Sequence, residues 1–222
     1  GGFSEATANF STALGYGTNA SAANATAVGV GAAASGTSAV AVGSSANASV
    51  ASGVAVGGSS QAPGTNGTAV GGSSRATGAN TTAVGQFAWA TAVGTTAMGR
   101  DSFAYGQNAT ALGLSAWANG VNSVALGAGA RAPEEGVVSI GNGTGAGGFP
   151  ATRRITNLAP GINATDAVNR AQLDAVAEVA ESTSKYFTAT GGADNDNAAA
   201  ADGDYATAAG ESAYAGADGA SA

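Results

Sequence analysis

The amino-acid sequence predicts a mainly β fold, a solenoid of fourteen-residue coils, on the strength of three regularities. An apolar residue followed by Gly recurs every fourteen positions without a gap, from Leu14 to Ile140. The position two residues before each of these apolar residues is always Thr or Val, and the position six residues after it is always Ala. With 37 Gly and 9% charged residues, the 222-residue chain cannot build a conventional core, but neighbouring coils of a solenoid can bury small faces against one another.

Each coil is expected to contain two short strands and two tight turns, which gives a flattened two-sided roll about ten coils, or roughly 48 Å, long. Asn122–Gly127 illustrates the first strand. Alternation places its β-branched and aliphatic residues on one face and Ala125 on the other. We expect the larger residues to fill the coil interior and the Ala column to face outward. Small residues fixed on an outward face favour side-by-side association of several rolls, the alternative being two tight faces within one sheet stack.

The composition excludes several classes of function. A net charge of −7 without a basic cluster argues against nucleic-acid binding. The absence of Cys and His removes disulfides, thiol or imidazole catalysis and the usual zinc sites, so we expect no catalytic residue, metal or cofactor. Gly-x-Gly pairs such as Gly15–Gly17 lack the third Gly of a nucleotide site. No signal peptide or membrane-spanning apolar run is present, and we expect the chain to be a piece of a longer protein.

One position of the repeat, which is expected to face outward, varies strongly from coil to coil. Five residues after each apolar core position, three successive coils carry large aromatic side chains, and the coils on either side carry Arg. Stacked coils bring these side chains to strand spacing, which predicts an exposed stripe for binding a protein, fibre or glycan. The alternative is that the rings lock coils together or fill a groove between subunits. With two flanking aromatics, the candidate ligand-binding residues are Arg75, Phe87, Trp89, Phe103, Tyr105, Trp117 and Arg131.

Beyond the repeats, Gly141–Gly148 reads as a flexible link, and a helix follows. Thr165 is its expected N-cap, with Asp166 complementing the helix dipole. A narrow heptad stripe is marginal in one helix, so the helix is expected to wind with copies of itself. Asn169 extends the stripe and is expected to set register, although a ring of Asn could also hold water or an anion. The stripe comprises Leu173, Val176, Ala180, Thr183 and Phe187.

The last 37 residues are acidic and rich in Gly and Ala. We expect a solvated linker, the alternative being loose calcium binding by Asp194, Asp196, Asp202 and Asp204. Thr207–Gly210 restores the repeat pattern, which predicts that a second array begins there.

These residues resemble the trimeric autotransporter adhesins. The repeat is similar to the family's head repeat, Asn-Ser-Val-Ala-Ile-Gly followed by a spaced Ala, which Asn122–Gly127 matches with Leu126 in place of Ile. Arg154–Gly161, with Thr165–Asn169 and Gln172-Leu173, resembles the family's neck, and Lys185–Phe187 resembles the opening of a further head segment.

The resemblance implies a left-handed parallel β-roll, three copies packed around an axis, and a neck that leads into a coiled coil. We expect residues 1–149 to form the head, 150–166 the neck, 167–187 a short coiled-coil helix, and 188–222 a linker and the start of a second head array. The expected neck and trimer residues are Arg154, Ile155, Asn157, Asp166, Val168, Asn169, Gln172, Leu173 and Val176.

The resemblance further implies a non-enzymatic homotrimeric adhesin, a virulence factor of the bacterial cell surface that binds a host-surface or extracellular-matrix protein or glycan. Its outer-membrane anchor would lie in a C-terminal region outside this sequence. The alternatives are a purely structural spacer and an ice-binding roll. Against ice binding, the Thr row interchanges with Val and is expected to point inward. An acyltransferase with a hexapeptide β-helix would need a period of six and a catalytic His, which the chain lacks.

Overall fold

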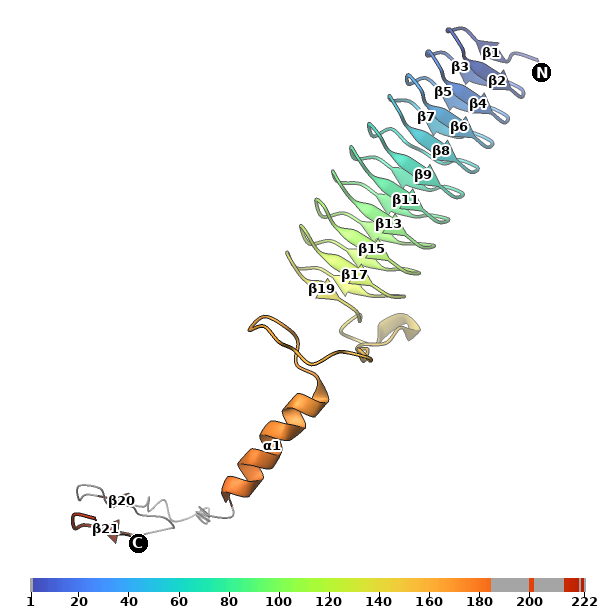
Figure 1. The fold of residues 1–222 in the computed structure, drawn as a ribbon. Helices are drawn as coiled ribbons and strands as arrows, with labels where there is room; N and C mark the ends of the chain where they lie inside the picture. The colour runs from blue at the N-terminus through green and yellow to red at the C-terminus, as the bar shows by residue number, and fades with distance from the viewer. Residues whose placement is uncertain (1, 185–199, 202–213, 220, 222) are drawn as a thin grey trace. The chain divides into compact units, whose positions relative to one another are not determined.

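The computed structural model describes residues 2–184, 200–201, 214–219 and 221. It divides into two compact units, Gly1–Arg154 and Ile155–Ala222, which are described separately. In the first unit, coil after coil stacks in one direction with a fourteen-residue period (Figure 1). This confirms the predicted parallel β-solenoid.

One wall of the solenoid is a ten-stranded parallel sheet in which each strand pairs with the next strand fourteen residues along the chain. For example, Thr82 pairs with Thr96 and Ala83 with Ala97. The strands of this ten-stranded sheet are β2 (Thr12–Leu14), β4 (Thr26–Val28), β6 (Val40–Val42), β8 (Val54–Val56), β9 (Thr68–Val70), β11 (Thr82–Val84), β13 (Thr96–Met98), β15 (Thr110–Leu112), β17 (Val124–Leu126) and β19 (Val138–Ser139).

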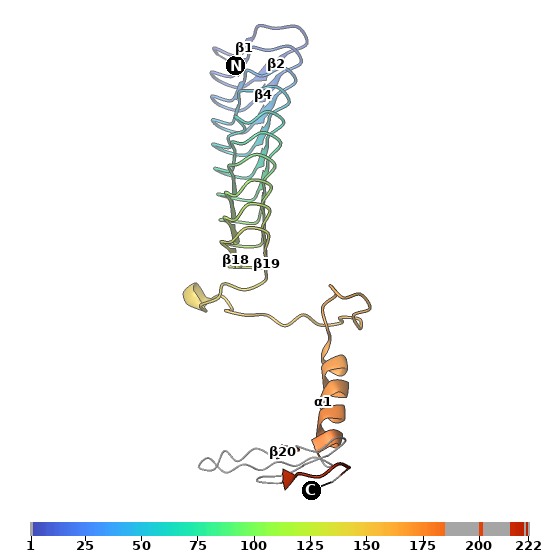
Figure 2. The ribbon, with the colours of Figure 1, turned by 90° about the vertical axis from the view of Figure 1, so that its left-hand side faces the viewer.

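The other wall, here called the short-strand wall, is built from two-residue strands, and Figure 2 shows the two walls side by side down to β18 and β19. It comprises a four-stranded sheet of β1 (Glu5–Ala6), β3 (Asn19–Ala20), β5 (Ala33–Ala34) and β7 (Asn47–Ala48), and a five-stranded sheet of β10 (Arg75–Ala76), β12 (Trp89–Ala90), β14 (Phe103–Ala104), β16 (Trp117–Ala118) and β18 (Arg131–Ala132).

The break between these two sheets lies in the coil that contains Pro63. In an intact coil, the amide of Ser35 donates to the carbonyl oxygen of Ala48 at 3.1 Å. Pro63 has no N–H to make the equivalent bond, whereas Gly64 donates to the carbonyl oxygen of Ala76 at 3.2 Å, as Gly36 does to that of Ala48 at 3.4 Å. Gln61 still bridges both neighbouring coils, so the wall continues through the break with fewer hydrogen bonds.

The turns repeat every seven residues, so each coil consists of two seven-residue halves. A left-handed backbone conformation marks each half, for example at Ser73, Asn80 and Phe87, each with φ of 56°. A separate glycine column makes the sharpest bend of each coil. Gly85 has φ of 131°, and a Cβ placed there would lie 2.5 Å from the carbonyl oxygen of Gly99 in the next coil. Glycine follows every apolar position because no other residue fits there.

Small side chains fill the space between the two walls. The buried cluster consists entirely of Ala, and the largest fully buried side chains are Thr18, Thr81, Thr95 and four Ser residues. The buried Ser and Thr hydroxyls donate to carbonyl oxygens three residues earlier, as Thr81 does to Gly78 at 2.7 Å. The interior is therefore one methyl group deep on each side.

The predicted orientation of the ten-stranded sheet was wrong. Ala125 is fully buried, whereas Val124 is half-buried and Leu126 is 44% exposed. The walls lie so close together that only methyl-sized side chains fit between them, which forces the β-branched and aliphatic columns outward. The Ala column is therefore the core and not an assembly surface. The outward face is instead a row of Thr, Val, Leu and Met side chains.

The C-terminal end of the solenoid is covered by a hydrogen-bonded cap, residues 141–153, where a flexible link was predicted. Asn142 organises it, because its Oδ1 accepts from the amides of Thr144 at 3.0 Å and Gly145 at 2.7 Å. Arg153 donates from its guanidinium to the carbonyl oxygens of Ile140 and Ala128. The cap includes a short 3-10 helix, η1 (Ala146–Gly148). It covers backbone groups that an open solenoid end would leave unpaired.

The second unit contains one helix, α1 (Arg170–Ser184), within its described part. Strands β20 (Ala200–Ala201) and β21 (Tyr214–Ala215) pair in parallel with the same fourteen-residue offset as the solenoid coils. No helix in the described ranges is long and apolar enough to cross a membrane. Several predictions lie outside the described residues, namely those for Lys185–Phe187, the acidic cluster Asp194, Asp196, Asp202 and Asp204, and Thr207–Gly210.

Candidate functional site

The short-strand wall carries the aromatic stripe on its outer face. From β3 to β18, the second residue of each strand of this wall is a fully buried Ala, which points the first residue away from the interior, as predicted. Strand pairing then aligns Arg75 with Trp89, Trp89 with Phe103, Phe103 with Trp117, and Trp117 with Arg131. These five residues and Tyr105 are called the aromatic ladder below.

The ladder is a continuous chain of ring contacts closed at each end by an arginine. The Trp89 and Phe103 rings meet edge to face, with centroids 5.5 Å apart, and Phe103 stacks on Tyr105 at 5.9 Å with an interplanar angle of 5°. Tyr105 then meets Trp117 edge to face at 6.5 Å. The Arg75 Cζ lies 5.3 Å from the Trp89 ring centroid, and the Arg131 Cζ lies 4.8 Å from that of Trp117. Both distances are within cation–π range.

Phe87 was predicted to join this stripe, but the structure places it in the turn before β12. Its backbone is left-handed, and its side chain is 44% exposed. Among the ring contacts of the described residues, none involves Phe87. A left-handed conformation is strained for a bulky side chain, and sequence parity could not reveal it.

The charged side chains of the ladder are all positive. From β10 to β18, the outward positions carry two Arg residues and no Asp or Glu, although the whole chain has a net charge of −7. The Nε of Arg75 and the Nε1 of Trp89 are buried and have no hydrogen-bond partner within the described part of the chain. Partial burial raises the pKa of the Tyr105 hydroxyl above its ordinary value, so this group stays neutral and able to donate.

Two hollows flank the Arg131–Trp117 stack. A hollow of about 390 Å³ lies on the side of the cap, and one of about 300 Å³ lies on the side of Phe103. The first is lined by Trp117, Asn119, Arg131, Pro133, Ser139, Asn142 and Gly143, and the second by Phe103, Tyr105, Ser115, Trp117 and Arg131.

The sequence analysis did not single out Asn119 and Pro133. They lie two residues after ladder positions and therefore share the outward face, so the same parity argument could have found them. It also missed Asn142 and Arg153 of the cap. No repeat pattern marks these two residues, because the cap begins where the repeat ends.

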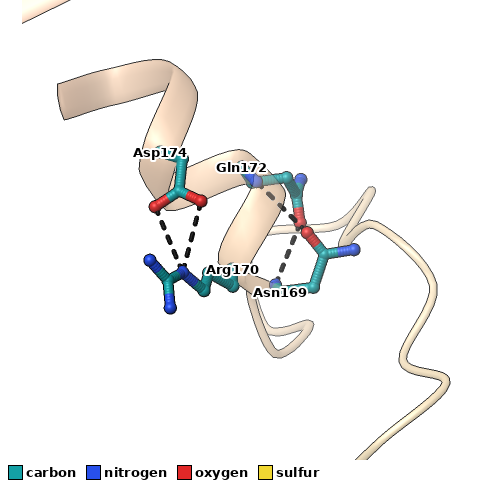
Figure 3. Close-up of polar contacts among 4 residues, drawn as sticks. All are labelled: Asn169, Arg170, Gln172 and Asp174. Carbon is teal, nitrogen blue, oxygen red and sulfur yellow. Dashed lines mark hydrogen bonds and ion pairs between the residues drawn. The ribbon is translucent and has the colours of Figure 1, made fainter. Parts of the chain in front are cut away.

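The predicted neck residues of the second unit form a polar network around the start of α1. Asn169 and Gln172 cap the helix reciprocally: Asn169 Oδ1 accepts from the Gln172 amide at 3.2 Å, and Gln172 Oε1 accepts from the Asn169 amide at 3.3 Å (Figure 3). This is a capping-box arrangement, and it makes Asn169 the N-cap in place of the predicted Thr165. Figure 3 also shows Arg170 pairing with Asp174 along the helix, at 3.3 Å.

The same side chains hold the preceding loop against the helix. Gln172 Nε2 donates to the carbonyl oxygen of Gly161 at 3.0 Å, and Asn169 Nδ2 donates to that of Leu158 at 3.1 Å. Asp166 accepts from the amides of Asn163 at 2.9 Å and Ile162 at 3.0 Å. These backbone hydrogen bonds, that of Asn163 first, lower the pKa of the Asp166 carboxyl.

Large apolar side chains of this unit are exposed to solvent. In the described part of the unit, seven of them are each more than 60% exposed: Ile155, Ile162, Val168, Leu173, Val176, Val179 and Tyr214. Arg154, in the first unit, is also exposed, and Asn157 occupies a left-handed turn.

The described residues contain no group of three or more His, Cys, Asp or Glu arranged to hold a metal ion. The ladder offers flat rings, two cations and hollows to a ligand. These are means of binding, and they do not include a nucleophile and base in contact.

Comparisons with known proteins agree with this architecture. A family model described as the YadA head domain repeat matches in overlapping stretches from residues 1–18 to residues 118–144, and one described as the coiled stalk of trimeric autotransporter adhesin matches residues 154–205. The crystal structure of the collagen-binding domain of the Yersinia adhesin YadA is similar, with a TM-score of 0.54 and 34% identity over 65% of this chain and 85% of that chain. No curated protein sequence matches the chain.

Proposed function

Because the chain belongs to the YadA-like trimeric autotransporter adhesins, which are bacterial surface adhesins, we propose that it is a non-enzymatic homotrimeric adhesin that attaches to host cells or extracellular matrix. The observation that carries this proposal is the aromatic ladder. Here large rings and cations occupy the strand position that holds Asn, Ala or Gln in the coils from Asn19 to Gln61, and this position faces away from the core. Exposed aromatic and Arg side chains in one patch are typical of recognition surfaces.

The two walls of the solenoid have different roles: the ten-stranded sheet forms the subunit interface, and the short-strand wall binds the ligand. The outward face of the ten-stranded sheet carries an apolar row beside its row of Thr and Val, and the apolar row includes Leu14, Met98, Leu112 and Leu126, each at least 40% exposed. One roll has only a methyl-deep core, so burying this row against two further copies would add the apolar burial that it lacks. Packing through the ten-stranded sheet leaves the opposite wall, with the ladder, in contact with solvent.

Trimerisation is also favoured by the second unit. Leu173 and Val176 are 63% and 66% exposed on α1, a fifteen-residue helix too short to be stable alone in water. Three copies would bury this stripe in a coiled coil. Attachment to the outer membrane would be made by a C-terminal anchor region of the longer protein.

The crystallised Yersinia domain is described as collagen-binding, which makes a matrix protein one candidate ligand for this chain. The test is a variant in which Trp89, Phe103 and Trp117 are all replaced by Ser. The matched control replaces Asn19, Asn47 and Gln61, at the same strand position in other coils, by Ser. We expect the first variant to lose adhesion to cells or matrix while its melting temperature is unchanged. A collapse of the melting temperature would show instead that the rings lock the coils together.

One observation favours the ice-binding alternative. The Thr residues of the ten-stranded sheet point outward, so the expectation of an inward Thr row no longer argues against ice binding. Val still interrupts the row at four positions: Val40, Val54, Val124 and Val138. Assembly through this face would cover the row. Thermal hysteresis of the assembled protein measures this activity directly, and we expect none.

A further inference from the structure

The ladder combines three features that single out one class of ligand. Its rings form a tiled apolar surface across three coils, and its ends carry guanidinium groups. The outward positions between these ends contain no carboxylate. The nearest acids along the chain lie in turns: Asp101 precedes β14 and pairs with Arg100 at 3.2 Å, and Glu134 and Glu135 lie beyond β18. The patch is thus locally cationic on an acidic protein.

Within the described residues, the two arginines lie on the rings and form no ion pair. Arg75 lies over Trp89, and both the Nε of Arg75 and the Nε1 of Trp89 are buried without an acceptor from that part of the chain. Buried donors without partners are rare in folded proteins and destabilise them. Anionic oxygen atoms of a ligand at this end of the ladder would supply Arg75 with acceptors for charge-assisted hydrogen bonds.

At the other end, Trp117 and Arg131 line both hollows. Each hollow also has a polar side chain in its lining, Asn119 in the larger and Ser115 in the smaller. An aromatic face together with an amide or hydroxyl group suits a sugar ring, whose C–H face packs on the aromatic ring while its hydroxyls form hydrogen bonds.

We propose that the aromatic ladder binds an acidic polysaccharide, whose sugar rings lie on Trp89, Phe103 and Trp117 and whose carboxylate or sulfate groups pair with Arg75 and Arg131. This proposal rests on the adhesive function proposed above and names its ligand class. Arg75 and Arg131 lie four coils apart, about 19 Å at the usual strand spacing, so the ligand must be an extended chain with repeated anionic groups. A proline-rich polypeptide would use the rings, but it would leave both guanidinium groups without a counter-charge.

The experiment titrates the assembled protein with saccharides of matched length and follows its intrinsic tryptophan fluorescence. Heparin oligosaccharides test sulfate, hyaluronan oligosaccharides test carboxylate, dextran oligosaccharides test a neutral sugar, and a triple-helical Pro-Pro-Gly peptide tests the polypeptide alternative. We expect one or both acidic saccharides to bind, and dextran to bind about tenfold more weakly or worse. Binding should weaken as salt concentration rises, because the guanidinium contacts are electrostatic.

Two variants locate the binding. Arg131→Gln and Trp117→Ala should each lower affinity for the acidic saccharide by about tenfold, while Arg131→Lys keeps part of it. The control Arg100→Gln removes the same charge from a turn, where Arg100 pairs with Asp101 at 3.2 Å, and should leave affinity unchanged. Circular dichroism melting of each variant confirms that it is folded.

The outcomes separate this proposal from the adhesive function on which it rests. If no acidic saccharide binds, or if binding is the same in Arg131→Gln and Trp117→Ala, the ligand class is wrong. Binding of the Pro-Pro-Gly peptide alone, lost in Trp117→Ala, would replace it with a polypeptide ligand. Adhesion to matrix could depend on the ladder and yet not be inhibited by either acidic saccharide. That result would support the adhesive function and overturn the proposed saccharide ligand. Absence of adhesion altogether would overturn the function itself.

Discussion

Thr96 and Ala97 are neighbours on β13, yet they lie on opposite sides of the solenoid wall: Ala97 is fully buried against the interior, and Thr96 is half-buried on the outer face. The same arrangement recurs along the ten-stranded sheet. It fixes the interior as a layer of methyl groups and makes the outer row available for assembly.

This arrangement predicts that valine is destabilising at one of two adjacent positions and nearly neutral at the other. Ala97→Val inserts two methyl groups where the walls leave no room and should lower the free energy of unfolding by about 1–3 kcal/mol per subunit. Thr96→Val places the same side chain in a row that already alternates between Thr and Val, so its effect should stay within about 0.5 kcal/mol. Thermal melting of the two variants checks this, and equal effects would contradict the assignment of the two faces.

Gly85→Ala adds a single methyl group and should destabilise the solenoid. The new Cβ would lie 2.5 Å from the Gly99 carbonyl oxygen, and alanine rarely adopts φ of 131°. Backbone strain of this kind costs about 1–3 kcal/mol, to which the overlap with the next coil adds. Chemical denaturation measures the loss. Gly58→Ala is the matched control, because its Cβ would lie 3.9 Å from the Ser44 carbonyl oxygen, which is ordinary van der Waals contact. A loss of stability as large as that of Gly85→Ala would refute the steric explanation.

Arg153→Ala should open the C-terminal end of the solenoid. Arg153 donates to the carbonyl oxygens of Ile140 and Ala128, and its removal leaves both acceptors without this donor, at a cost of about 1–3 kcal/mol. Hydrogen exchange should accelerate in β17 to β19 and stay unchanged near β2. Arg100→Ala, which breaks an exposed ion pair, is the control and should have little effect. Uniform acceleration along the whole solenoid would argue against a local cap.

Tyr105 should titrate above its ordinary pKa of 10.0, because partial burial disfavours the charged phenolate. In the unfolded chain the hydroxyl loses its proton first, so the folded state binds more protons in this window. The free energy of unfolding therefore falls as pH rises above about 10. The ultraviolet absorbance titration of the wild type minus that of Tyr105→Phe isolates this group. A midpoint at or below 10.0 would contradict the observed burial.

Asp166 should titrate below its ordinary pKa of 3.8, because the amides of Asn163 and Ile162 donate to its charged form. A depressed folded-state pKa contributes stability at pH values above the unfolded pKa, and this contribution is lost as pH falls through the folded pKa. Carboxyl carbon NMR shifts of Asp-labelled protein, assigned by comparison with Asp166→Asn, give the midpoint. A value of 3.8 or higher would mean that the loop of residues 161–166 is not held as described.

The sequence predicted the period, the parallel pairing and the position of the ladder, because each depends on strict fourteen-residue spacing. It did not predict which face of the ten-stranded sheet points inward. Alternation separates Val124 from Ala125 but does not say which of them is inside, and the usual preference for larger apolar residues in a core gave the wrong answer. The distance between the walls decides this question, and that distance depends on the turn geometry of residues such as Gly85.

The candidate site was also predictable from the sequence only in part. The outward direction of Trp89, Phe103 and Trp117 was predictable, since a recurring Ala follows each of them and is buried. The position of Phe87 depends on its left-handed backbone conformation, which residue spacing does not reveal. The contacts of Arg75 and Arg131 with the rings depend on side-chain rotamers, which spacing does not reveal either. The cap residues Asn142 and Arg153 lie beyond the last repeat, where no periodic signal remains.

The seven-residue rhythm of the left-handed turns has a consequence for how such a head can change in length. Removing fourteen residues between Leu14 and Val56 shortens the column by one step of about 4.8 Å and leaves each side chain on its original wall. Removing seven would still set buried Ala upon buried Ala, because Ala20 and Ala27 occupy equivalent places in the two halves. It would nevertheless exchange the outer walls, so that half of each roll presented its apolar row to solvent. A deletion of seven residues would therefore disrupt the assembly face while the core stayed intact, whereas a deletion of fourteen would preserve both. The ladder keeps a fixed count of coils from the cap while the far end remains free to lengthen or shorten.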